Sequence, residues 1–138
     1  MSAQTLPAKW EEQFNTGVEF LDEQHRYFFT VAKRLEAVIN HHNCSDQVAD
    51  IFFSLVHYVE HFRLREEIYY KDLKLKKIDE HKNLHLDFVA GIVQFKDEYT
   101  RGEKDVCRNL LRFLTNWFYE HIIGTDNDMI AELKKAGL

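Results

Sequence analysis

Hydrophobic residues recur three and four positions apart along most of the chain, which is the period of an amphipathic helix. Alternation typical of strands is not sustained anywhere, and helix breakers are rare, with one proline at position 7 and five glycines. The pattern predicts four long helices, from about Val18 to Asn40, from Asp46 toward Tyr69, from about Asp79 to Tyr99, and from Glu103 or Asp105 to Gly124. The sequence therefore predicts an all-α fold.

Four amphipathic helices of roughly 20 residues, each about 30 Å long and joined by short loops, predict an up-down-up-down antiparallel four-helix bundle. The length of 138 residues is typical of one domain. Within a single domain spanning 1–138, we expect an ordered N-terminal arm over 1–17, the bundle over 18–126 and a short C-terminal helix over 127–138.

Composition and charge exclude several classes of protein. The formal net charge of −5 gives no general attraction to nucleic acid or to an anionic membrane. No apolar run approaches the ~20 residues of a membrane span, and the N-terminus has no apolar segment typical of a secretion signal, so we expect a cytoplasmic location. Cys44 and Cys107 form no CxxC pair and are expected to be reduced thiols.

Eight histidines are the unusual feature of the composition, and five of them fall on the hydrophobic stripes. For a single histidine in such a position, a core imidazole satisfied by a hydrogen bond is the more common explanation. Five buried imidazoles without a shared partner would each cost on the order of 1 to 3 kcal/mol, and a bound metal would remove that cost. The five candidate ligands are His25, His61, His81, His85 and His121.

Two carboxylates strengthen the metal interpretation. Glu66 follows His61, and Asp126 lies five residues after His121. A five-residue step in a straight α-helix turns the side chain by about 140°, so Asp126 reaches the site only if the helix bends or ends near Gly124. Seven donors are too many for a tetrahedral zinc site and suit two metals bridged by carboxylates, for which iron is the best match.

Several motifs together resemble the hemerythrin family, specifically its single-domain bacterial members, over nearly the full length of the chain. The matching segments are Trp10, Gly17-Val18, LDEQH ending at His25, HF at 61–62, Glu66-Glu67, HKNLH at 81–85, and WFYEHIIGTD from Trp117 to Asp126. The resemblance implies reversible dioxygen binding at two iron ions that share a hydroxo or oxo bridge.

The resemblance also implies a role for each site residue. One iron would be bound by His81, His85 and His121, and the other by His25 and His61. Glu66 and Asp126 would bridge the two irons. The oxygen pocket beside His121 would be lined by Trp117, Phe118 and Ile122.

The spacing between His61 and Glu66 departs from the family pattern by one residue, because four positions beyond His61 lies Arg65. An extra residue can be absorbed as a π-bulge, which would turn Glu66 back toward the site. In the alternative, the helix stays regular, Arg65 points inward and the site is altered. The bulge is favoured because a buried arginine beside two cations would be severely unfavourable.

Three further histidines are not assigned as ligands. His57 lies one turn before His61 and is expected to be a neighbour of the site or partly exposed, while His41 and His42 are expected in a solvated loop. The leading function is non-enzymatic oxygen storage, transport or sensing by a monomer. The alternatives are a di-iron redox enzyme acting on peroxide, dioxygen or nitric oxide, and an iron-binding sensory module; the histidine-rich ligand set argues against the enzyme.

Overall fold

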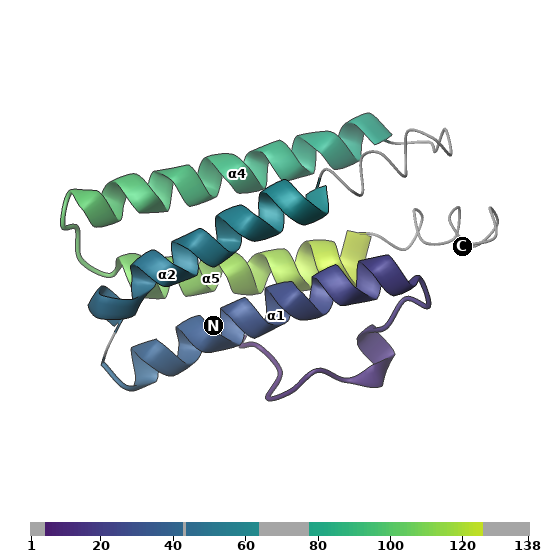
Figure 1. Ribbon diagram of the computed structural model, residues 1–138, viewed down its shortest axis with the longest axis horizontal. Helices are drawn as coiled ribbons and strands as arrows, with labels where there is room; N and C mark the ends of the chain where they lie inside the picture. The colour runs from purple at the N-terminus through teal and green to yellow at the C-terminus, as the bar shows by residue number, and fades with distance from the viewer. Residues whose placement is uncertain (1–4, 43, 64–77, 126–138) are drawn as a thin grey trace.

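The computed structural model describes residues 5–42, 44–63 and 78–125, which are helical apart from the arm and the turns (Figure 1). The described residues contain no strand, so the expectation of an all-α fold is confirmed. The elements are a 3-10 turn η1 (Glu12–Phe14), the α-helices α1 (Glu19–Asn40), α2 (Cys44–His57), α4 (Ile78–Thr100) and α5 (Val106–Trp117), and the π-helical segments η2 (Tyr58–Arg63) and η3 (Phe118–Thr125).

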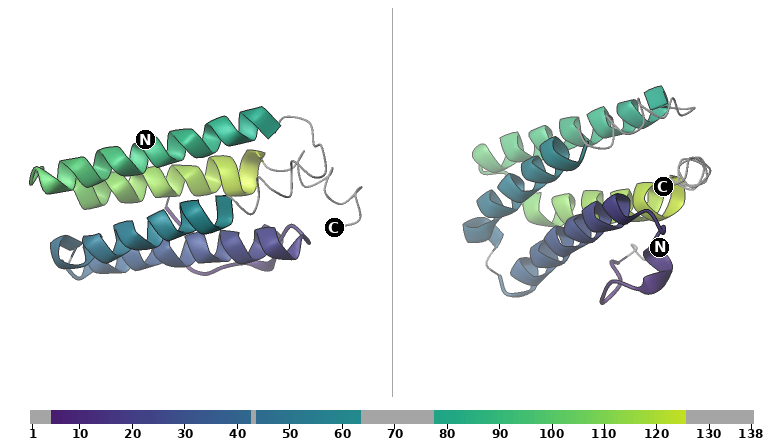
Figure 2. Two further views of the ribbon diagram at one scale, coloured as in Figure 1. Left: turned by 45° about the horizontal axis from the view of Figure 1, so that its top comes forward. Right: turned by 45° about the vertical axis from the view of Figure 1, so that its right-hand side comes forward.

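The four α-helices lie side by side along the long axis of the molecule (Figures 1 and 2). Following the colours from purple to yellow, α1 and α4 run in one direction and α2 and α5 run in the other. The start of α2 and the start of α5 therefore lie at the same end of the molecule. The segments η2 and η3, which continue these two helices, both lie toward the opposite end.

Helix α1 shows why the hydrophobic period predicts the fold well. It begins one residue after the expected Val18 and ends at the expected Asn40. Its inward stripe includes Leu21, Phe28 and Leu35, each fully buried. Apolar burial of this kind contributes about 25 cal/mol per Å², so a continuous stripe favours one rotational setting of the helix.

The N-terminal arm is fixed to the bundle by Asp22, a buried residue near the start of α1. The Oδ1 atom of Asp22 accepts hydrogen bonds from the backbone N–H of Thr16 at 2.7 Å and from its hydroxyl at 2.8 Å, and Oδ2 accepts one from the N–H of Gly17 at 3.2 Å. Gly17 has a φ of 87°, a conformation that glycine adopts without steric cost. These bonds satisfy the buried carboxylate and turn the arm back along α1.

Aromatic side chains complete the packing of the arm. The ring of Phe14 lies 5.6 Å from that of Phe118, and the ring of Trp10 lies 5.7 Å from that of Phe29, centroid to centroid. The hydroxyl of Tyr119 also donates a hydrogen bond of 2.6 Å to the backbone oxygen of Thr5. The arm therefore covers the junction between α1 and η3.

A disulfide joins Cys44, the first residue of α2, to Cys107, the second residue of α5. The expectation of two reduced thiols is therefore wrong. The two Cα atoms are 6.3 Å apart, within the range that a disulfide can span. Closing a loop across a sequence separation of 63 reduces the entropy of the unfolded chain by an amount worth about 4 kcal/mol in the chain-entropy account.

Two other expected helix ends need correction. Helix α2 begins at Cys44, two residues before the expected start at Asp46, which lies within its first turn. Gly124 does not end the fourth helix, because it lies inside η3, where the chain changes from α-helical to π-helical winding. The C-terminal helix expected over 127–138 lies outside the described residues.

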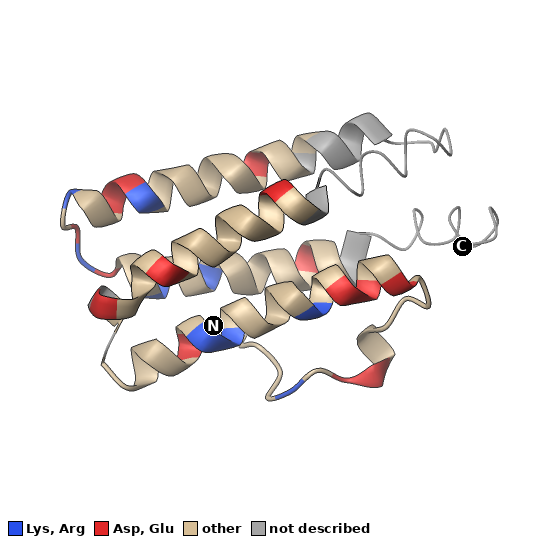
Figure 3. Ribbon diagram, viewed as in Figure 1, with Lys and Arg blue, Asp and Glu red and all other residues tan. Residues whose placement is uncertain are grey.

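Charged residues of both signs occur along α1 and α4, whereas α2 carries only acidic ones and α5 only basic ones (Figure 3). In the loop between α4 and α5, Arg101 donates a hydrogen bond of 2.9 Å from Nε to Glu103. This bond and the charge of Glu103 raise the pKa of the Arg101 guanidinium. Within the described ranges, no helix is both long enough and apolar enough to cross a membrane.

Candidate metal centre

Two of the five candidate histidines come together between α4 and η3. His85 and His121 are 6% and 4% exposed, and their ring centroids lie 5.5 Å apart. Burying two imidazoles side by side removes both from water, and such polar groups need a partner inside the protein. The pair is therefore suited to binding a metal, which accepts the lone pair of a neutral imidazole.

Trp117, the last residue of α5, packs against both of these rings. Its ring lies 4.1 Å from that of His121 and 6.2 Å from that of His85. The indole Nε1 of Trp117 is buried and has no hydrogen-bond partner among the described residues. A buried indole N–H without an acceptor is unusual, because such groups nearly always find one, so this donor would suit a ligand with an acceptor atom beside the two histidines.

His25 belongs to the inward stripe of α1 and is 1% exposed. The residue before it, Gln24, is equally buried, and within the described ranges its Oε1 atom has no hydrogen-bond partner. A buried amide oxygen without a donor costs on the order of 1 to 3 kcal/mol. Two polar side chains, Gln24 and His25, are therefore buried next to each other on α1, among mostly apolar residues. Buried polar groups are typical of a binding site and uncommon in a hydrophobic core.

His61 differs from the other described candidates because its side chain is exposed. The sequence period assigns it to the interior, and that expectation is wrong for the imidazole in this structure. His61 lies in η2, where π-helical winding turns the chain less per residue than an α-helix, so the α-helical stripe cannot be extrapolated through it. Its ring stacks on that of His57 at 5.2 Å, and His57 is exposed too, which agrees with the expectation of a residue that is next to the site or partly exposed.

The segment η2 is π-helical over Tyr58–Arg63, next to and partly overlapping the stretch between Phe62 and Glu66 where the spacing predicts a π-bulge. In a π-helix the N–H of residue i+5 bonds to the C=O of residue i, so residues five apart come nearly into line. The regular α-helix considered as the alternative does not occur over Tyr58–Arg63. Glu66 and Arg65 themselves lie outside the described residues.

The segment η3 gives the same winding to the second pair with a five-residue step, from His121 toward Asp126. The sequence predicts that this helix must bend or end near Gly124 if Asp126 is to reach the site. In the structure the helix continues past Gly124, and its winding is π-helical over Phe118–Thr125. Both motifs with an imidazole followed five residues later by a carboxylate therefore begin in π-helical turns.

Three candidate ligands cannot be placed. Glu66 and Asp126 lie outside the described residues, and so does the side chain of His81, although its backbone belongs to α4. Among the side chains that the structure does describe, no group of three or more His, Cys, Asp or Glu residues is close enough to hold a metal ion. The structure does describe imidazoles from α1, α4 and η3, and imidazole is a suitable ligand for iron.

The three candidate pocket residues occupy different surroundings. Trp117 packs on His121, whereas the ring of Phe118 is fully buried against Phe29 of α1, at 5.5 Å, and the arm. Ile122 is 3% exposed and belongs to the main hydrophobic core. Trp117 is therefore the pocket residue with a direct contact to a described candidate ligand.

Comparison with known proteins finds a family that matches most of the chain. Residues 16–133 match the family described as the hemerythrin HHE cation binding domain. The chain belongs to the hemerythrin family. The matched residues begin at the arm's hydrogen bonds to Asp22 and include every candidate ligand, from His25 to Asp126.

Relatives with the same family name align over most of their own length. The bacteriohemerythrin of Clostridium acetobutylicum is 29% identical over 125 residues, which cover 88% of this chain and 97% of that protein. The bacteriohemerythrin of Pseudomonas aeruginosa is 29% identical over 134 residues, covering 92% and 82%. The myohemerythrin of Theromyzon tessulatum is 30% identical over 121 residues, covering 87% and 88%.

Sequence reasoning missed two features that organise this hemerythrin. In the sequence, Asp22 looks like an ordinary charged residue on the surface of α1. Its burial could have been inferred only from its position three residues before His25, which places both side chains on the inward face of the helix. The hydrogen-bond donor of Trp117 was also missed, because an aromatic residue on a bundle helix usually indicates only core packing.

Proposed function

We propose that this hemerythrin reversibly binds dioxygen at a non-haem di-iron centre, without net chemistry. The observation that carries the proposal is the buried contact between His85 and His121 beneath Trp117. The proposed ligands are His81, His85 and His121 for one iron, His25 and His61 for the other, and Glu66 and Asp126 as bridges, together with a hydroxo or oxo group.

Two iron ions would supply the electrons needed to hold dioxygen and to release it unchanged. The protein's own contribution is to orient the imidazoles and to keep water away. Phe88 lies against Trp117, with ring centroids 4.6 Å apart, and its side chain is 2% exposed. This apolar cover lowers the local polarity, and exclusion of water suppresses side reactions at a reactive centre.

The indole N–H of Trp117 is a buried donor beside the histidine pair, without an acceptor in the part of the chain that the structure describes. We assign it a positioning role: it would donate a hydrogen bond to a small acceptor ligand held next to His121. Such a bond orients the ligand and adds about 1 kcal/mol to its binding.

Exposure of His61 is consistent with this proposal only if its imidazole turns inward when iron binds. The proposal therefore requires a different His61 rotamer when iron binds, and rotamers interconvert readily at exposed positions. The stacking partner His57 would then lose its contact with His61. Loss of that stacking on iron binding is an expected consequence of the proposal.

The competing function is a di-iron redox enzyme that acts on peroxide, dioxygen or nitric oxide. The histidine-rich ligand set favours oxygen binding, because carboxylate-rich sites are the ones that stabilise high-valent iron. We also propose the finer features that accompany the family: a cytoplasmic location, a monomeric state and up-down-up-down connectivity through residues 64–77.

An optical titration tests the function. The protein is loaded with ferrous iron without oxygen, exposed to air, and then deoxygenated by a stream of argon. We expect a visible ligand-to-metal charge-transfer band that appears in air and disappears under argon through repeated cycles. Irreversible oxidation in the first cycle, or steady turnover of added hydrogen peroxide, would instead support the enzyme.

A further inference from the structure

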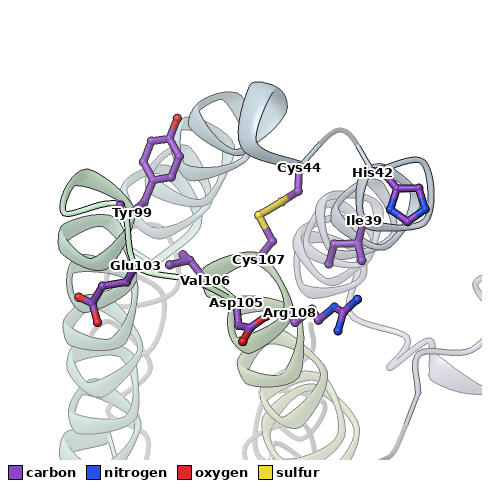
Figure 4. Close-up of a pocket in the computed structure, with 10 residues that line it drawn as sticks. Ile39, His42, Cys44, Tyr99, Glu103, Asp105, Val106, Cys107 and Arg108 are labelled. Carbon is purple, nitrogen blue, oxygen red and sulfur yellow. A yellow bond between two sulfur atoms is a disulfide. The ribbon is translucent and has the colours of Figure 1, made fainter.

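The disulfide between Cys44 and Cys107 connects two helix N-termini at the end of the molecule away from η2 and η3 (Figure 4). Both cysteines are partly buried and both line a cavity of about 510 Å³. The sulfur atoms therefore lie where a small reagent or an extended side chain from a partner can reach them. Access is the first requirement for thiol–disulfide exchange.

The position of the two sulfurs at helix N-termini favours their reduced form. The first turn of an α-helix has N–H groups without intrahelical partners and a positive end of the helix dipole, and both stabilise a thiolate. Asp105 occupies the N-cap position of α5, but its side chain makes no capping hydrogen bond. The N–H groups beside Cys107 are therefore not occupied by the residue that would normally bind them.

Backbone conformation on each side of the disulfide gives a second, independent observation. The described chain has two residues other than glycine with positive φ, His42 at 57° and Asp105 at 64°. Each lies two residues before one of the cysteines. Aspartate and histidine adopt this left-handed region more readily than most residues, so these two turns hold the cysteines at the starts of α2 and α5 at low steric cost.

The charges around the cavity are mixed. Glu103 is paired with Arg101, with 2.6 Å between the carboxylate Oε2 and the guanidinium Nη2. Asp105 and Arg108 also line the cavity. Arg108 is therefore the Arg or Lys residue of the cavity lining, and it follows Cys107 directly in the sequence.

We propose that Cys44–Cys107 is a reducible disulfide, exchanged by a dithiol reductant that enters from this cavity, and that it fixes η2 relative to η3 while it is closed. In the exchange, one thiolate of the reductant attacks a sulfur of the disulfide and expels the other sulfur as a thiolate. The second thiol of the reductant then breaks the mixed disulfide. The protein gains two electrons and two protons, and the reductant leaves as a disulfide.

The link to η2 and η3 follows from the helices that the disulfide joins. Helix α2, continued by η2, leads from Cys44 to His61, and α5, continued by η3, leads from Cys107 to His121 in the same direction (Figure 1). At 1.5 Å per residue, the two candidate ligands lie about 25 Å and about 20 Å from the disulfide. A bond at the shared start of two parallel helices limits how far one can slide or tilt against the other. This half of the inference rests on the proposed function, because η2 and η3 matter through those ligands.

In the proposed cytoplasmic location this disulfide would be exposed to reductants, because the cytosol keeps accessible thiols reduced and its disulfides are usually transient. The fraction of protein in which the disulfide is closed would then depend on the ratio of dithiol to disulfide reagents around it.

The first experiment measures exchange on the native, metal-free full chain. Protein purified without reductant is treated with dithiothreitol in the absence of denaturant, and released thiols are counted by alkylation and mass spectrometry. We expect none before treatment and two per chain after it. Two free thiols before treatment, or a disulfide that opens only in denaturant, would overturn the proposal.

Charge variants test whether the helix end controls the reaction. Reversing the charge with Arg108→Glu should slow reduction about fivefold, because the leaving thiolate loses its neighbouring cation. Arg112→Glu makes the same change one turn further along α5 and should leave the rate unchanged. Equal rates for the two variants would contradict the assigned role of the cavity charges.

Hydrogen–deuterium exchange tests the link to the site without any iron. Reduction should raise amide exchange about threefold over 58–63 and 118–125, as well as beside the cysteines. The double variant with Cys44→Ser and Cys107→Ser should already exchange at the faster rate and should not respond to dithiothreitol. Faster exchange confined to the turns beside the cysteines would overturn the link, whereas failure to bind iron would affect only the proposed function.

Discussion

The rings of His85 and His121 lie 5.5 Å apart at an interplanar angle of 71°, buried between α4 and η3. These residues are 36 positions apart in the sequence, so only the packing of the two helical segments brings them together. Two imidazoles in an apolar interior require either hydrogen-bond acceptors or a metal. The contact is therefore the part of the proposed iron site that the structure defines best.

Removing one member of this pair should remove iron. In His121→Ala, we expect the iron content of anaerobically reconstituted protein to fall from two per chain to one or fewer, because one iron loses an imidazole ligand. Iron is counted by inductively coupled plasma mass spectrometry, and helicity is checked by circular dichroism. His42→Ala, at an exposed position at the other end of the molecule, is the control and should retain two. Two irons in His121→Ala would contradict the ligand assignment.

The π-helical winding of η2 makes a prediction about two adjacent carboxylates. If it brings Glu66 into line with His61, Glu66→Ala should abolish dinuclear iron binding. Glu67→Ala removes the same charge one position later and should leave iron content unchanged. The reverse result, with iron lost in Glu67→Ala and retained in Glu66→Ala, would mean that the winding places a different residue in the site.

Asp22 should stabilise the protein through the arm. Asp22→Ala leaves the N–H groups of Thr16 and Gly17 without their acceptor and is expected to lower the free energy of unfolding by about 2 to 3 kcal/mol. Glu23→Ala removes an exposed carboxylate from the next position and should change it by less than about 0.5 kcal/mol. Urea unfolding followed by circular dichroism measures both, and equal effects would show that Asp22 does not anchor the arm.

Gly91 allows close approach between α4 and α5. A Cβ atom at this position would lie 2.5 Å from Cζ and 2.8 Å from Cε2 of the Phe113 ring. Gly91→Ala should therefore destabilise the protein by about 1 to 2 kcal/mol through overpacking. In a Phe113→Ala background the obstruction is gone, and the same change should stabilise by up to about 1 kcal/mol through helix propensity. Thermal unfolding of the four proteins gives the sign in each background; an unchanged sign would exclude the steric explanation.

The sequence predicts the regular helices well and their irregular continuations less well. Helix α1 follows its stripe because every turn buries the same face, so each apolar residue supports the same rotation. His61 fails this rule because the winding changes at Tyr58, and a stripe carried through a π-helical turn assigns residues to the wrong face.

Long-range features depend on distances that no local pattern contains. Cys44 and Cys107 have no motif spacing, and their bond follows only from two helices starting at the same end of the molecule. The candidate histidines are easier to find from the sequence, because burying an imidazole on an apolar stripe costs free energy unless the imidazole has a hydrogen-bond partner or a metal. Their assembly into a complete site depends on Glu66 and Asp126, which lie beyond the described ranges.

Measurement of dioxygen uptake and release tests the central claim most directly. Reduced, di-iron protein is placed in a sealed oxygen-electrode cell, and dissolved dioxygen is followed on addition of protein and again after a competing ligand or vacuum drives release. We predict uptake of one dioxygen per chain and return of nearly all of it unchanged. Uptake with no return, or continued consumption beyond one dioxygen per chain, would contradict reversible binding and identify the centre as an oxidase.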